Sequence, residues 1–156
     1  MNPTQNGIDI NSYAPKAAFD LAQIDTPAAS EAGCEIQLEF NGKPTGWFVT
    51  VRGEHSPTVK KWQLGVGNKF RLKEWQDKRK GKGDTPTPMT EEDLEMGLRG
   101  AAVRIAKFKG IVFAGQPFEF NETNAYELVR RHPPFADQIL EASSEITNFT
   151  KAQQAT

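Results

Sequence analysis

The sequence predicts an α+β fold in which a β-hairpin and one or two further short extended segments pack with about four helices. The hairpin is indicated by residues 34–40, where apolar and polar side chains alternate strictly, and by residues 41–46, where Asn, Gly and Pro supply a turn. The helices are indicated by later segments in which apolar residues recur at spacings of three and four. Residues before the hairpin are expected to form a flexible arm.

The composition is that of an ordinary globular protein. The 156 residues suffice for one domain with one core, and 37% of them are apolar and 25% charged. The net charge of -1 argues against a whole-molecule field that would attract nucleic acid or a membrane. Cys34 is the only cysteine, which excludes an intrachain disulfide and a thiolate-rich metal site. No signal peptide and no apolar run of roughly 20 residues is found, so we expect a soluble cytoplasmic protein.

Shifts in composition divide the chain into four parts. Residues 1–33 are rich in Asn, Pro, Ala, Ser and Thr and are expected to form a flexible, mildly acidic arm. Residues 34–150 are expected to form a single α+β domain. Within it, residues 78–89 read as a mobile basic, proline-rich linker, because they combine charge, glycine and proline with almost no apolar side chain. Residues 151–156 are expected to fray.

The first half of the domain is predicted to be a hairpin followed by a helix. The strands are expected at 34–40 and 47–51, the second being rich in aromatic and β-branched residues. Ser56-Pro57 is a favourable helix start, and the helix is expected to run to about Lys78. Gly65 and Gly67 each weaken its middle by roughly 1 kcal/mol relative to alanine, so a bend there is expected.

The second half is predicted to contain three more helices. Thr90 caps the first, with acidic residues in its opening turn, and the apolar face of this helix is expected to continue to Phe108. Two short extended pieces are expected around Ala114-Gly115. The next helix begins near residues 121–123 and is stopped by Pro133-Pro134, and the last covers 135–149.

A search for catalytic chemistry finds little. His55 and His132 lie far apart and outside any metal-binding spacing, and a lone histidine carries no mechanism without a positioned partner. No nucleophile-elbow pattern is present, and neither Gly65-Val-Gly67 nor Gly81-Lys-Gly83 completes a phosphate-binding loop. The acidic cluster at 91–95 is explained by its position at a helix start. We therefore expect no catalytic residue, no cofactor and no metal, and a protein that is not an enzyme.

One basic stretch stands above the background charge. Its cations are Lys60, Lys61, Lys69, Arg71, Lys73, Lys78, Arg79, Lys80 and Lys82. Only Glu74 and Asp77 oppose them, and three aromatic residues are interleaved, Trp62, Phe70 and Trp75. Such a pattern can bind single-stranded nucleic acid, but it is also that of an amphipathic helix whose aromatics face the core, and the periodicity favours this second interpretation. A third is contact with an acidic protein, or with the acidic arm of a neighbouring copy.

The C-terminal segment contains a series of short motifs: Phe108-Lys-Gly-Ile111, Gly115-Gln-Pro-Phe118, Phe120-Asn-Glu-Thr-Asn-Ala125, Leu128, His132-Pro-Pro-Phe135, Gln138-Ile139 and Asn148-Phe149. In this series the segment resembles the C-terminal part of tail assembly chaperones from long-tailed bacteriophages. Upstream, residues 49–56 are similar to the family strand that ends in Gly-x-x-Ser before a long helix. The resemblance covers about 37–152, and Phe108 stands where the family more often has tryptophan.

The resemblance implies a non-catalytic chaperone of viral morphogenesis in the host cytoplasm. Its partners would be the tape measure protein, kept soluble by the chaperone, and the tail tube protein, with self-association as a further possibility and no membrane contact. The candidate contact residues are aromatic and basic: Trp62, Phe70, Trp75, Lys78, Arg79, Lys80 and Phe108. Two alternatives stay open, a structural component of the virion tail (a terminator or tube-associated protein) and an accessory protein that binds single-stranded nucleic acid.

Overall fold

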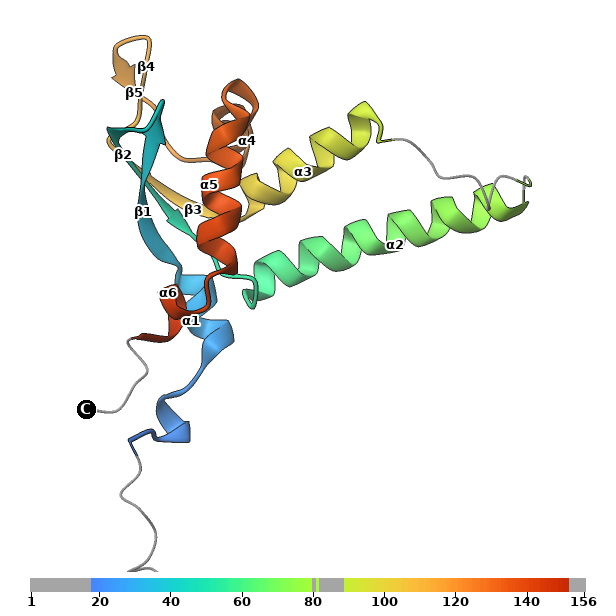
Figure 1. Ribbon diagram of the computed structural model, residues 1–156, viewed down its shortest axis with the longest axis horizontal. Coiled ribbons are helices and arrows are strands. Elements are labelled where there is room, and N and C mark those ends of the chain that lie inside the picture. The colour runs from blue at the N-terminus through green and yellow to red at the C-terminus, as the bar shows by residue number, and fades with distance from the viewer. Residues whose placement is uncertain (1–17, 80, 82–88, 152–156) are drawn as a thin grey trace, which may run out of the picture.

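The computed structural model describes residues 18–79, 81 and 89–151 (Figure 1). A three-stranded sheet with helices α4 and α5 beside it forms the body, and the long helix α2 projects away from it. The α+β prediction is confirmed. None of the described helices combines the length and the apolar character needed to cross a membrane.

The predicted hairpin is present. Strand β1 (Cys34–Phe40) pairs antiparallel with β2 (Lys43–Val51), and the turn residues Asn41 and Gly42 both have positive φ, 52° and 75°. A two-residue turn of this kind matches the right-handed twist of the strands, which is why Asn-Gly is favoured there. Alternate side chains face the helices, and Leu38, Val49 and Val51 are fully buried.

A third strand replaces the end of a predicted helix. Helix α3 (Glu91–Val103) begins at Thr90 through the expected capping box, but it ends five residues before Phe108. Strand β3 (Ile105–Lys109) follows and pairs antiparallel with β2, giving the order β1-β2-β3. The expectation of a continuous helix to Phe108 was therefore wrong, because hydrogen bonding to β2 outweighs the local helical periodicity.

Helix α2 (Pro57–Arg79) runs as one uninterrupted helix of 23 residues, about 35 Å long. The helix is not broken at Gly65 or Gly67, where the sequence predicted a bend. Trp62 sets the close approach to α3, where a Cβ added at Gly100 would lie 3.0 Å from the indole ring. Beyond that point α2 and α3 diverge (Figure 1).

The C-terminal part covers the sheet. Short strands β4 (Val112–Phe113) and β5 (Gln116–Pro117) form a second hairpin, and helices α4 (Glu122–Arg131) and α5 (Pro133–Ser144) follow. The single helix expected over 135–149 is divided, since α5 ends at Ser144 and α6 (Thr147–Thr150) is separate. The core lies between α3, α4, α5 and the sheet. Its largest fully buried apolar side chains include Leu38, Ile105, Ile139, Val49, Val51 and Val129.

Part of the segment expected to form a flexible arm is folded. A 3-10 turn, η2 (Leu21–Gln23), is followed by helix α1 (Thr26–Ala32), which contacts α2 and α6. The folded domain thus begins within the segment assigned to the arm, and residues 1–17 lie outside the described part. Most of the expected linker, residues 80 and 82–88, and residues 152–156 of the tail also lie outside it, whereas residues 78 and 79 belong to α2.

A polar cluster joins α1 to the start of α2. The carboxylate of Glu31 accepts hydrogen bonds from the hydroxyls of Ser56 and Thr58 and lies 3.4 Å from Nε of Arg52. Burial raises the pKa of Glu31, but the hydrogen bonds from Ser56 and Thr58, with the charge of Arg52, outweigh it and leave this pKa below its ordinary value. Ser56 also caps α2, with Oγ 3.3 Å from the amide nitrogen of Val59.

Candidate functional site: an aromatic groove

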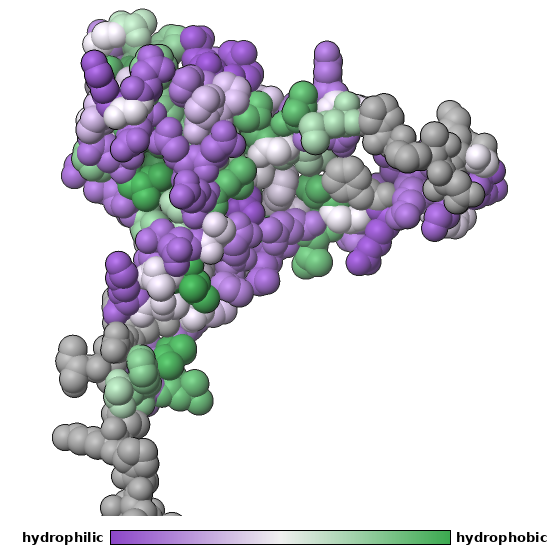
Figure 2. All heavy atoms as spheres, viewed as in Figure 1, coloured by the Kyte–Doolittle hydropathy of each residue, from purple (hydrophilic) through white to green (hydrophobic). Residues whose placement is uncertain are grey.

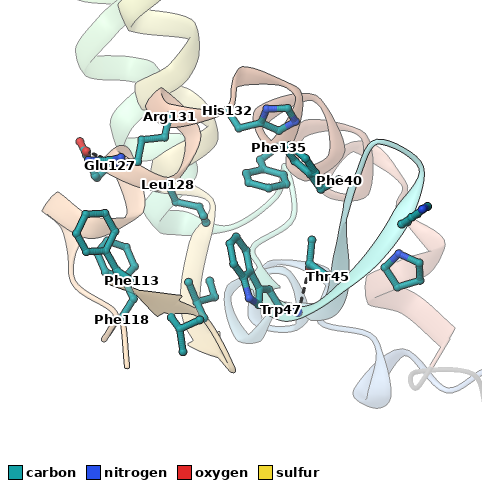
Figure 3. Close-up of a pocket in the computed structure, with 14 residues that line it drawn as sticks. Phe40, Thr45, Trp47, Phe113, Phe118, Glu127, Leu128, Arg131, His132 and Phe135 are labelled. Carbon is teal, nitrogen blue, oxygen red and sulfur yellow. Dashed lines mark hydrogen bonds and ion pairs between the residues drawn. The ribbon is translucent and has the colours of Figure 1, made fainter. Parts of the chain in front are cut away.

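An apolar groove of about 550 Å³ lies at the surface between the two hairpins and the α4–α5 junction (Figure 3). We call it the aromatic groove. Its six rings are Phe40, Trp47, Phe113, Phe118, His132 and Phe135. A cavity of this size, lined mostly by apolar side chains with a smaller number of polar ones at its edge, is typical of a binding site.

The first wall is the β1–β2 hairpin. Phe40 ends β1 and Trp47 lies on β2, so the turn brings both rings to the same edge of the groove. The hydroxyl of Thr45 holds this turn: Oγ1 donates to the carbonyl of Leu38 at 2.7 Å and accepts from the amide of Trp47 at 3.0 Å. The wall is therefore fixed by hydrogen bonds as well as by packing.

The second wall is the β4–β5 hairpin. Phe113 and Phe118 flank the turn at Ala114-Gly115, whose residues both have positive φ, and their ring centroids lie 5.6 Å apart. The amide of Phe118 donates to the carbonyl of Ile111 at 2.8 Å, which closes the base of this hairpin. Phe113 is 45% exposed, so it presents one side to the groove and one to solvent.

The floor comes from α4 and α5. Leu128 and Phe135 are both nearly buried, and His132 sits between the two helices with its ring 4.6 Å from Phe135 and 4.8 Å from Phe40 (Figure 3). Trp47 contacts Phe135 edge-on, with ring centroids 6.1 Å apart. These aromatic contacts bind the floor to the first wall.

The rim carries a small set of charges. Glu127 accepts hydrogen bonds from Arg130 and Arg131, and these bonds lower the pKa of Glu127 to about 2. Arg131 also lies over the Phe113 ring, 4.7 Å from its centroid. Lys43 lines the opposite side of the groove. Glu127 therefore stays ionised at neutral pH and orients the two arginines, so its role here is structural.

The residues predicted to contact a partner do not lie in this groove. Trp62 is half-buried on the face of α2 that meets α3. Trp75 is 55% exposed near the far end of α2, where the guanidinium of Arg79 stacks on it at 4.9 Å and Lys78 lies 3.9 Å from Glu74. The Phe70 side chain and Lys80 lie outside the described part. The structure therefore brings Trp75, Lys78 and Arg79 together but separates them from Trp62.

Phe108 lies directly behind the groove. It is half-buried on β3, where its ring stacks on Phe118 at 5.8 Å and meets Phe120 edge-on at 5.4 Å. Phe108 thus supports a ring of the groove without lining the groove itself.

Sequence reasoning missed the groove as a site, although a signal was present. Aromatic residues flank both hairpin turns, Phe40 and Trp47 around the first and Phe113 and Phe118 around the second. Five of the residues that carry the family resemblance line the groove: Ile111, Phe118, Leu128, His132 and Phe135. The other residues of the resemblance lie outside the groove lining.

Comparison of the chain with protein-family models, with curated protein sequences and with solved structures found no match. Among the described residues, no group of three or more His, Cys, Asp or Glu side chains is placed to hold a metal ion.

Proposed function

We propose that the protein is a non-catalytic binding protein whose aromatic groove holds an apolar segment of another protein. The observation that carries the proposal is the exposure of large apolar side chains around a buried floor. Phe40, Val112 and Phe113 are 48%, 52% and 45% exposed, and they surround Leu128 and Phe135. Contiguous apolar surface of this kind is stabilised when a partner covers it.

The partner that fits best is an amphipathic helix or an extended apolar segment of a long helical protein. Grooves lined by aromatic and aliphatic side chains bind the apolar faces of helices through a few anchoring residues. The family resemblance implies the tape measure protein, and five of the residues that carry the resemblance line the groove. In this proposal the chain acts in the host cytoplasm as a tail assembly chaperone and aids recruitment of tail tube protein.

The nucleic-acid alternative has less support along α2. Besides Trp75, the large apolar side chains of this helix that the structure describes as exposed are Leu64 and Leu72, and an aliphatic side chain cannot stack on a base. Trp75 is itself covered on one face by Arg79. Among the α2 side chains that the structure describes, the exposed apolar surface is thus better suited to a protein than to single-stranded DNA.

The test is co-expression with the tape measure protein encoded beside the gene, followed by measurement of binding. A groove variant, Phe40→Ser with Phe113→Ser, removes two half-exposed rings. We expect it to weaken binding at least about 30-fold, the loss of one anchoring residue worth roughly 2 kcal/mol. The matched control is an α2 variant, Leu72→Ser with Trp75→Ser, which removes two side chains that are 56% and 55% exposed.

The outcomes separate the candidates. An equal loss of tape measure binding in the groove variant and the α2 variant would contradict the groove as the binding site. The proposal is also contradicted if wild-type protein neither co-purifies with the tape measure protein nor raises its solubility. Recovery of the chain in purified virions at ring stoichiometry favours the structural-component alternative over the chaperone.

A further inference from the structure

A second apolar surface lies at the opposite end of the molecule from the groove. We call residues 19–24 the apolar hook. Phe19, Leu21 and Ile24 are 55%, 82% and 41% exposed. The turn η2 fixes them, because Asp20 Oδ1 accepts from the amide of Ala22 and the amide of Ile24 donates to the carbonyl of Leu21. Figure 2 shows an apolar group at this end, beyond the body of the molecule.

The hook cannot fill the groove of its own chain. It is tied to α1 at the base of the body, where α1 contacts α2 and α6, whereas the groove lies past the far end of β1 (Figure 1). The seven residues of β1 alone span about 23 Å. The six hook residues, even fully extended, reach about 20 Å and point away from β1 in the structure.

We propose that the hook of one copy docks in the aromatic groove of a second copy. The chain thus carries both halves of one interface, a short apolar projection and an apolar groove of about 550 Å³. Leu21, the most exposed of the three side chains, is the anchor, and Phe19 and Ile24 contact the groove walls. The inference rests on the groove of the proposed function and names an additional occupant for it.

The charges of the two surfaces are complementary. The hook contains one acid, Asp20, and no basic residue. The groove is lined by the cations Lys43 and Arg131 against the single acid Glu127, which is paired with Arg130 and Arg131. A weakly acidic hook is therefore attracted to the rim, and the attraction falls as salt screens it.

The contact joins different surfaces of the two copies, so it is head-to-tail. A contact of this type extends into an open chain or closes into a ring, and it is not limited to a dimer. Because the hook and a partner segment would use the same groove, self-association and partner binding exclude each other at each site.

The experiment uses complementary variants. A hook variant, Phe19→Ser with Leu21→Ser, keeps its groove, and the groove variant keeps its hook. We expect wild-type protein to associate increasingly with concentration in sedimentation velocity, and each variant alone to stay monomeric. An equimolar mixture is expected to form a 1:1 heterodimer that grows no further, because only one intact hook and groove can meet.

Three results would overturn the proposal: wild-type protein that is monomeric at every concentration tested, a mixture of the two variants that stays monomeric while wild type associates, or an α2 variant that is monomeric. Should the groove variant fail to fold, a synthetic peptide of residues 18–26 is titrated into the hook variant instead. Changes in NMR shifts confined to the groove support the proposal, and none at about millimolar peptide refutes it.

The same variants separate this inference from the proposed function. The hook variant is expected to bind the tape measure protein as well as wild type or better, since its groove is free of competition. If wild-type protein self-associates but does not bind the tape measure protein, only the proposed function is refuted. If it binds the tape measure protein but does not self-associate, only this inference is refuted.

Discussion

Arg104 forms an ion pair whose loss gives a sharp stability prediction. Its side chain is 7% exposed, and its Nη2 donates to both carboxylate oxygens of Glu54 at 2.9 and 3.0 Å. Nε donates to Glu54 and to Ser143 Oγ, each at 3.1 Å. Ser143 Oγ in turn donates to the carbonyl of Arg52, so the pair joins α3, α5 and the loop before α2.

Glu54→Gln is expected to destabilise the fold by about 3 kcal/mol. Breaking a buried pair leaves an uncompensated charge and costs about 3–5 kcal/mol. The lower end of this range applies because the Glu54 side chain is 35% exposed, so water reaches part of the pair. In a chain of this size the loss corresponds to a fall in Tm of roughly 6–12 °C, or of about 1.5 M in the urea midpoint.

A double variant separates the charge effect from general damage. Arg104→Met added to Glu54→Gln removes the buried cation and fills most of its volume, so we expect about 2 kcal/mol to be recovered, measured by urea unfolding as a double-mutant cycle. Glu95→Gln is the control, because its pair with Arg99 is half-exposed on α3 and costs less than about 0.5 kcal/mol. The reasoning fails if Glu54→Gln destabilises the fold no more than Glu95→Gln does. It also fails if the losses of stability from Glu54→Gln and Arg104→Met simply add in the double variant.

Two further predictions concern backbone geometry and pH. Gly110→Ala is expected to lower the free energy of unfolding, measured in urea, by at least about 1 kcal/mol more than Gly115→Ala does. Both glycines have φ of +78°, but only at Gly110 would a Cβ meet backbone, the Gly46 oxygen at 2.9 Å. Equal losses of stability in the two variants would contradict this contact. Since the pKa of Glu31 is lowered in the folded state, its stabilising effect is present at neutral pH and lost as the pH falls below about 4.5. The urea midpoints of wild type and Glu31→Gln should therefore converge on acidification, and a gap that is independent of pH would rule this out.

The parts of the fold that the sequence predicted depend on neighbours along the chain. The hairpin follows from the alternation in β1 and from a turn that accepts Asn41-Gly42. The start of α3 follows from the capping box, in which Thr90 and Asp93 exchange hydrogen bonds. In each case the chemistry that decides the structure lies within a few residues.

The parts that escaped prediction depend on contacts between distant segments. Residues 101–108 have helical periodicity, yet β3 forms because Val49 pairs with Phe108 across the sheet. Helix α3 gives way to β3 at Arg104, whose side chain donates a hydrogen bond to Glu54, fifty positions earlier in the sequence. The groove escaped for the same reason, because its rings come from two hairpin turns and a helix junction, and no local pattern reports their meeting.

The walls of the groove are fixed by hydrogen bonds within the chain itself. Gln138 on α5 donates to the carbonyl of Glu39 at 2.9 Å and accepts from the Glu39 amide at 2.8 Å, so the end of β1 is fixed against the floor helix. Thr45 and the Phe118 amide hold the two hairpins in the same way. A groove fixed in this manner loses little conformational entropy on binding, so a few apolar side chains of a partner suffice for useful affinity. These bonds fix each wall on its own supporting element, and Phe40 and Phe113 stay 48% and 45% exposed at the edges of the groove.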